Sequence, residues 1–208
     1  MVRHTTSSKE VIDLLIAWLG VSFAFYLVLF LRPNLSHASV EYVLPSLIIT
    51  LVVVGSSFVL HELLHKFTAQ HFGFWSEFRA SYTMLVFAIL FAALAGIVFA
   101  APGATMIYAP AITKRQNGII SAAGPILNLA LGGLFLLLYL LSPMGGVLRD
   151  LGWYGFVINV WFSAFNLLPI GPLDGKKVLD WGIPQFVAIA AVPFLAAIFV
   201  AINVFHVL

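Results

Sequence analysis

The sequence His61-Glu62-Leu63-Leu64-His65 holds the side chains best suited to chemistry in this chain. On a helix, His61 and His65 share one face, so both imidazoles can bind one zinc ion. Glu62 follows His61 directly and can act on a water molecule beside the metal without being a ligand. The motif lies near the end of an apolar segment, 43–72, that is long enough to cross a bilayer. Because ionisable groups are costly at membrane depth, this cluster predicts a metal site with a catalytic base rather than a chance match.

The composition is that of an integral membrane protein. The chain has 208 residues, of which 62% are hydrophobic and 9% charged, whereas soluble domains carry about 25% charged residues. The connecting segments leave no room for a soluble domain, so we predict one membrane-embedded domain over 1–208 with its core at about 43–180. The chain contains no cysteine, so zinc must be held by histidine and carboxylate. The formal net charge of +2 gives no case for nucleic-acid binding.

The hydropathy pattern predicts an all-α polytopic membrane protein with five or six transmembrane helices. The predicted spans are 11–31, 43–72, 118–141, 153–168 and 183–204, and the first is read as a retained span rather than a cleaved signal peptide. The segment 83–101 is also long and apolar enough to span. Alternating residues on either side of it, Trp75–Arg79 and Thr105–Tyr108, predict a short membrane-associated β-hairpin.

The metal needs a third protein ligand, because two histidines leave zinc incomplete. Of the four aspartates, Asp174 stands out because prolines and glycines interrupt the helix around it. Broken helices in membranes are tolerated where they line a wet cavity or lie buried in protein. The interrupting residues are Pro169, Gly171, Pro172 and Gly175. Taken alone, Asp174 is as well explained as an interfacial carboxylate beside Lys176 and Lys177.

Two motifs in this order resemble the site-2 protease family of intramembrane zinc metalloproteases. The first is the His-Glu-x-x-His sequence, and the second comprises Asn166, Pro169, Leu173, Asp174 and Gly175. A Gly124-Pro125-x-x-Asn128 element lies between them, and the resemblance covers roughly 60–179. The apolar run 83–101 departs from the family pattern, and the chain has no appended PDZ or CBS domain.

The resemblance implies one zinc ion per chain, held by His61, His65 and Asp174, with Glu62 as the catalytic base. It also implies that Asn166 contacts the substrate backbone. We further assign Asn128 to substrate binding, with a helix-packing contact as the alternative. The reaction implied is hydrolysis of a peptide bond within or next to a transmembrane helix of a membrane protein substrate. The two strands could bind that substrate by strand addition or could form a structural hairpin.

Two other classes of protein remain open. A zinc transporter would also bury histidine and aspartate, but its ligands would be spaced along a path across the membrane. A non-proteolytic zinc-binding membrane protein would have no use for Glu62. The partners expected are a transmembrane substrate and the lipid bilayer, and the sequence does not indicate an oligomeric state.

The segment 83–101 decides the topology. His61 and Asp174 can meet at one zinc ion only if their helices run parallel, whereas a full crossing at 83–101 would set them roughly 30 Å apart. We therefore predict that the segment enters the membrane and returns, with Phe78 and Thr105 on the same side and the helix from Gly118 covering its turn.

The distribution of basic residues supports the same choice. A full crossing at 83–101 would place five basic residues on each side of the membrane, whereas a returning segment leaves Arg32 and Arg149 outside and the remaining eight on the side of the N-terminus. By the positive-inside rule we predict an active site toward the cytoplasm. We expect the protein to lie in the plasma membrane. The eight are Arg3, Lys9, Lys66, Arg79, Lys114, Arg115, Lys176 and Lys177.

Overall fold

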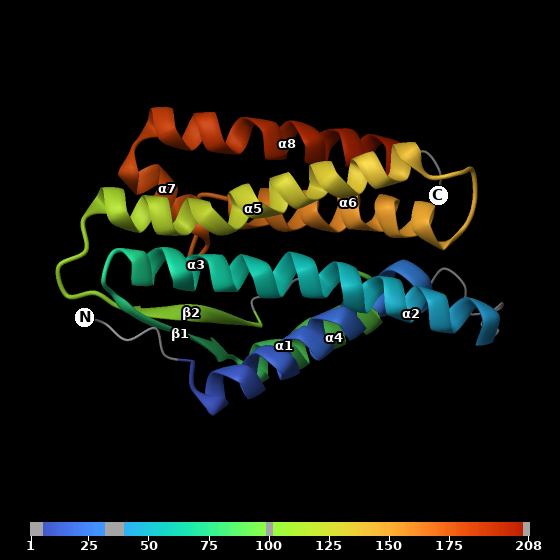
Figure 1. The fold of residues 1–208 in the computed structure, drawn as a ribbon, viewed down its shortest axis with the longest axis horizontal. Helices are drawn as coiled ribbons and strands as arrows, with labels where there is room; N and C mark the ends of the chain where they lie inside the picture. Colours follow the sequence, from blue (N-terminus) through green and yellow to red (C-terminus); the bar gives the residue numbers. More distant parts are fainter. Residues whose placement is uncertain (1–5, 32–39, 99–101, 206–208) are drawn as a thin grey trace.

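The computed structural model describes residues 6–31, 40–98 and 102–205, and these are mostly helical with one two-stranded sheet (Figure 1). Within these ranges, two helical stretches contain π-helical turns, labelled η, in which the helix is locally widened. In chain order the elements are α1 (Ser8–Tyr26), η1 (Leu27–Leu31), α2 (Val40–Val54), η3 (Gly55–Val59), α3 (Leu60–His71), β1 (Trp75–Ala80), α4 (Tyr82–Ala95), β2 (Gly103–Tyr108), α5 (Lys114–Leu141), α6 (Val147–Asn166), α7 (Asp174–Trp181) and α8 (Ile183–Phe205).

Four helical stretches in the described part of the chain are long and apolar enough to cross a membrane. They are Ser8–Leu31, Val43–His71, Lys114–Leu141 and Ile183–Ile202. The predicted span at 153–168 lies in α6, which does not meet this criterion on its own. Arg149 and Asp150 at its start and the buried Asn159 lower its hydropathy, and Asn159 is bonded to α5. The structure thus agrees with a helical, multi-pass membrane protein, and its four candidate spans do not decide between five and six crossings.

Small residues bring α5 and α6 into close contact. A Cβ atom at Gly152 would lie 2.5 Å from the backbone nitrogen of Tyr139, and one at Gly155 would lie 2.3 Å from the Phe135 ring. Glycine at helix interfaces in membranes allows this approach and the van der Waals packing that it brings. The two helices therefore form a tight antiparallel pair (Figure 1).

A buried ion pair joins the start of α1 to α3, the helix that carries His61 and His65. Lys66 Nζ lies 2.5 Å from Glu10 Oε2, and both side chains are almost fully buried. Glu10 Oε1 accepts a hydrogen bond of 3.0 Å from the backbone N–H of Phe78. Because a buried charge is costly without its partner, this pair ties α1 to α3 and β1.

The chain leaves and re-enters the hairpin at the same place. β1 and β2 pair antiparallel, with Phe78 opposite Thr105 and Ala80 opposite Gly103. Just beyond them, Ser81 N–H donates a 2.7 Å hydrogen bond to Pro102 C=O. The prediction that Phe78 and Thr105 lie on the same side is therefore confirmed. The intervening α4 has 14 residues, about 21 Å of helix, which is shorter than a membrane core of about 30 Å.

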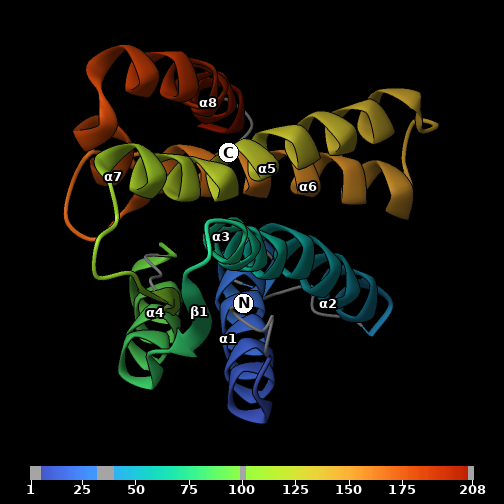
Figure 2. The same cartoon turned by 60° about the vertical axis from the view of Figure 1, so that its left-hand side comes forward.

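The helix α4 packs against α1 and not against α5 (Figure 2). Leu85 fits over Gly20, where a Cβ atom would lie 2.6 Å from Leu85 Cδ1. Tyr82 donates a 2.5 Å hydrogen bond to Asp13 and accepts one of 2.8 Å from Lys9. The expectation that the helix from Gly118 covers this segment is therefore wrong, because α1 offers both a small residue and a polar anchor.

Candidate active site and metal centre

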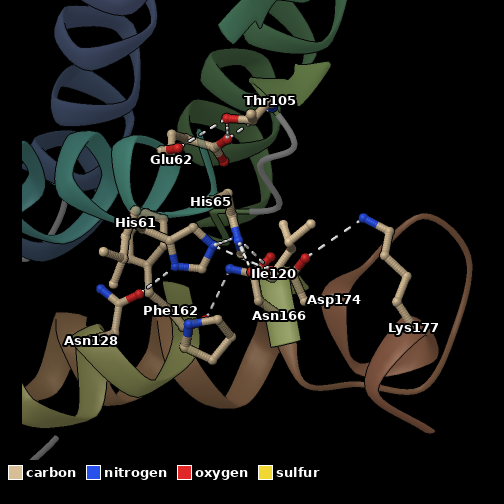
Figure 3. A network of polar contacts seen from close by, with 12 residues as sticks. His61, Glu62, His65, Thr105, Ile120, Asn128, Phe162, Asn166, Asp174 and Lys177 are labelled. Carbon is tan, nitrogen blue, oxygen red and sulfur yellow. Dashed lines mark hydrogen bonds and ion pairs between the residues drawn. The ribbon is translucent and has the colours of Figure 1, made fainter. Parts of the chain in front are cut away.

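Three side chains from two distant segments converge beside the first two turns of α3 (Figure 3). His61 Nε2 and His65 Nε2 are 2.9 Å apart, and Asp174 Oδ2 lies 3.3 Å from the first and 3.0 Å from the second. Two ligand atoms bound to one tetrahedral zinc ion are about 3.3 Å apart, given bonds of about 2.0 Å. The donor set of two imidazoles and one carboxylate is also that of catalytic zinc sites. The residues therefore fit the predicted zinc ion.

Both imidazoles are oriented by hydrogen bonds from the ring nitrogen that faces away from the metal position. His61 Nδ1 lies 2.5 Å from Asn128 Oδ1, and His65 Nδ1 lies 2.7 Å from Ile120 C=O. Because oxygen acceptors face both Nδ1 atoms, the protons lie there and each Nε2 keeps its lone pair for the metal. This is the tautomer that zinc binding requires.

Asn128 lies behind His61 and not where a substrate would contact it. Its side chain is fully buried. Its amide nitrogen donates to Ser57 C=O at 2.9 Å and to Asn159 Oδ1 at 3.0 Å, which fixes the amide so that its oxygen faces His61. Asn128 is not among the residues that line the cavity, and its contacts are those of a residue that orients a ligand between packed helices.

Gly124 explains why α5 can pass so close to the histidines. A Cβ atom at Gly124 would lie 2.6 Å from both His61 Cε1 and His65 Nε2, so a side chain there would displace the ligands. On the preceding turn of α5, the Ile120 carbonyl accepts the hydrogen bond from His65. The sequence identified the Gly124-Pro125-x-x-Asn128 motif, but it did not show that the position of Gly124 has no room for a side chain.

The broken helix around Asp174 is present as predicted. The helix α6 ends at Asn166, and α7 begins at Asp174. Gly171 has a φ of +53°, a conformation that favours glycine. Gly175 serves close packing, because a Cβ atom there would lie 2.1 Å from Leu167 C=O. The sequence interpretation treated both glycines as loosening the chain, whereas Gly175 lets α7 pack onto the end of α6.

The two oxygens of Asp174 have different neighbours. Oδ2 faces both histidines, whereas Oδ1 lies 3.7 Å from Lys177 Nζ. Oδ2 is therefore the oxygen placed to bind the metal together with the two histidines, and the other oxygen faces the ammonium of Lys177.

Glu62 is anchored to β2 in the cavity that the three candidate ligands also line. The backbone N–H of Thr105 donates to Glu62 Oε2 at 3.0 Å, and Thr105 Oγ1 lies 2.9 Å from the same oxygen. Thr105 Oγ1 is also 3.0 Å from the main-chain carbonyl of Glu62. Sequence reasoning identified Thr105 only as part of a strand, because nothing in the local pattern links residues 43 positions apart.

A cavity of about 140 Å³ joins these groups. It is lined by His61, His65 and Asp174, by Glu62 on the same helix, and by residues of β2, α5 and α6. Asn166 also lines it, and its amide nitrogen donates to Phe162 C=O at 2.9 Å. The predicted base, the predicted ligands and Asn166 thus share one cavity.

Comparison with known proteins gives sequence relatives that are named as zinc metalloproteases, although no family model matches the chain. The chain is 41% identical over 189 residues to "Putative zinc metalloprotease MJ0611" of Methanocaldococcus jannaschii, covering 91% of this chain and 92% of that protein. It is 35% identical over 148 residues to Rip2 of Mycolicibacterium smegmatis, covering 62% and 56%, and 29% identical over 159 residues to YwhC of Bacillus subtilis, covering 68% and 70%.

Among solved structures, the site-2 protease from Methanocaldococcus jannaschii matches with a TM-score of 0.44 and 19% identity, over 90% of this chain and 79% of that chain. The family assignment rests instead on the sequence identity to MJ0611, which extends along nearly the whole of both chains. It agrees with the two motifs whose residues meet in the cavity. The chain belongs to the site-2 protease family of zinc metalloproteases.

Proposed function

We propose that this chain is an intramembrane zinc endopeptidase that hydrolyses a peptide bond within or next to a transmembrane helix of a membrane protein substrate. The observation that carries this proposal is Glu62, a carboxylate that is not a ligand but shares the cavity with the three ligands. A zinc transporter would need ligands at several depths, whereas these gather at one point. A purely structural zinc site would need neither Glu62 nor a cavity.

The residues that line the cavity have different roles in the proposed hydrolysis. Zinc, when bound by His61, His65 and Asp174, would polarise the scissile carbonyl and make water a stronger nucleophile. Glu62 accepts the proton of the attacking water and delivers it to the leaving amine. Among the described residues, the Asn166 side chain bonds only to Phe162 through one N–H, so its amide oxygen and second N–H can serve an unwound substrate backbone.

The outer edge of β2 is suited to hold that backbone. The N–H of Thr105 points away from β1, and in an antiparallel pair this orientation recurs at every second residue. Gly103 and Ile107 therefore present their backbone groups on the same edge, and both line the cavity. An extended substrate could pair with these two positions by strand addition, on either side of Thr105.

An apolar cleft leads toward this cavity from the side of the helix bundle. Its volume is about 300 Å³, and it lies between η1, α6 and α8. A smaller hollow shares Phe25, Val98 and Trp161 with the cleft and adds Phe162, which also lines the active-site cavity. A hydrophobic substrate segment could thus approach the metal without leaving an apolar environment.

The proposal is tested with purified enzyme in liposomes and a panel of single-span membrane proteins, each tagged at both ends. We expect cleavage of at least one panel member inside or beside its apolar segment. A zinc chelator should abolish the cleavage, and added zinc should restore it. Cleavage that persists in the chelator, or no cleavage of any panel member by zinc-loaded enzyme, would contradict the proposal.

We also propose that the protein crosses the plasma membrane five times, with the active site toward the cytoplasm. The paired ends of the 81–102 segment and the basic residues near the site support this arrangement. Single cysteines introduced at Arg79 and Lys114, in a chain without cysteine, should label with a membrane-impermeant thiol reagent from the same, cytoplasmic face. Labelling from opposite faces would show that α4 belongs to a full crossing, and labelling of both from outside would reverse the orientation.

A further inference from the structure

We infer that Thr105 is a positioning residue for the general base, a role that rests on the function proposed above. Its backbone N–H and its hydroxyl both reach Oε2 of Glu62, at 3.0 and 2.9 Å. Hydrogen bonds to an ionised acceptor are stronger than those between neutral groups. Together they fix a side chain that has three rotatable bonds and would otherwise be free in the cavity.

Both hydrogen bonds from Thr105 end on the same oxygen of Glu62, Oε2. A general base needs its other oxygen free to accept a proton from water. Glu62 Oε1 has no hydrogen-bond partner among the described residues, whereas Oε2 has two donors. The carboxylate is thus anchored through one oxygen and offers the other to the attacking water. A base must be held within hydrogen-bond reach of the proton that it removes, so the anchor contributes to the rate through geometry.

The hydroxyl of Thr105 can donate a hydrogen bond to Glu62 whether the carboxyl group of Glu62 is ionised or protonated. It lies 2.9 Å from Oε2 and 3.0 Å from the main-chain carbonyl of Glu62, and its one proton can be donated to only one of them at a time. When Glu62 carries the proton taken from water, the hydroxyl can donate to the main-chain carbonyl. The contact with Glu62 is therefore kept through the proton transfer.

The position of Thr105 is set by the pairing of β2 with β1 and by the packing of β1 against η3. Register pairs Thr105 with Phe78, whose ring packs edge-on against Phe58 at a centroid distance of 5.7 Å. Phe58 belongs to η3, directly before the helix that carries Glu62. At the start of β2, a Cβ atom on Gly103 would lie 2.3 Å from Arg79 C=O, so only glycine allows the strands to approach this closely. Thr105 and Glu62 are thus held to one rigid unit.

The first test separates positioning of the base from substrate binding and from folding. Thr105→Val keeps the shape and the backbone N–H but loses the hydroxyl, so we expect kcat to fall about tenfold. KM, zinc content and unfolding temperature should stay at their wild-type values, and Thr105→Ser should restore kcat. Thr68→Val is the matched control, because this hydroxyl on the same helix as Glu62 bonds only to Leu64 C=O among the described residues.

A second test needs no substrate. In zinc-loaded Glu62→Ala, the amide of Thr105 loses its acceptor, so its hydrogen exchange should accelerate at least severalfold. The amides of Ala104 and Met106, which point toward β1, should be unchanged. Unchanged exchange at Thr105, a wild-type kcat in Thr105→Val, or a loss confined to KM or zinc content would overturn the inference. Retained cleavage in Glu62→Gln would instead overturn the proposed function, so the two failures are distinguishable.

Discussion

Replacing Glu62 with glutamine should abolish peptide hydrolysis and leave zinc bound. Glutamine keeps the size of the side chain and can still contact Thr105, but it cannot accept the proton of the attacking water. General-base catalysis is worth about 10²–10⁴-fold in rate, so we expect a loss of at least this size. Cleavage of the panel substrates gives the rate, and metal analysis of the purified variant gives the zinc content.

The matched control for this variant is Glu77→Gln. Glu77 lies on β1, is buried, bonds to Ser7 and Arg79, and is not among the residues that line the cavity. It should retain cleavage, which would show that the substitution as such is tolerated. Cleavage by Glu62→Gln at a wild-type rate would remove Glu62 from its role as the base, and loss of its zinc would make Glu62 a ligand instead.

Replacing Asp174 with alanine should release zinc and abolish activity together. Asp174 Oδ2 is the atom that completes the cluster with His61 and His65, at 3.3 and 3.0 Å. Loss of a residue that merely supports a ligand weakens metal binding by about 10–100-fold, so loss of a ligand itself should weaken it by more than about 100-fold. Zinc affinity measured by competition with a chelator would report this directly.

Asp180→Ala is the control for that experiment, because Asp180 lies on the same short helix but is exposed and paired with Lys176. It should leave both zinc affinity and cleavage unchanged. Unchanged zinc affinity in Asp174→Ala would mean that another group completes the coordination. Excess zinc that restores cleavage in Asp174→Ala would show that this residue acts through metal affinity alone.

The sequence was most informative where chemistry depends on local spacing. Four-residue spacing on a helix was enough to place His61 and His65 on one face, and the prolines and glycines near Asp174 were enough to predict a broken helix. The need for both segments to meet at one metal also predicted that the chain around α4 returns to the same side. These predictions required no knowledge of which helices pack together.

Contacts between distant segments could not be predicted in the same way. The bonds of Thr105 to Glu62 and of Asn128 to His61 depend on how a strand and a helix dock onto α3. The neighbour of α4 was predicted incorrectly, because the fit of Leu85 over Gly20 is a matter of shape and not of pattern. The bonds of Asn159 and Ser163 to α5 could not be predicted either, because they depend on which faces of α5 and α6 meet.

The widened turn η3 changes how the helix that carries the metal ligands should be understood. It lies between α2 and α3, so it sets the rotation of His61 and His65 relative to the membrane-facing stripe of α2. Each residue turns a helix by about 100°, and an extra residue absorbed in a π-helical turn shifts the two halves out of phase. The exposed apolar stripe of α2 (Leu44, Ile48 and Val52) and the histidines of α3 are therefore related by a rotation that an uninterrupted α-helix would not give.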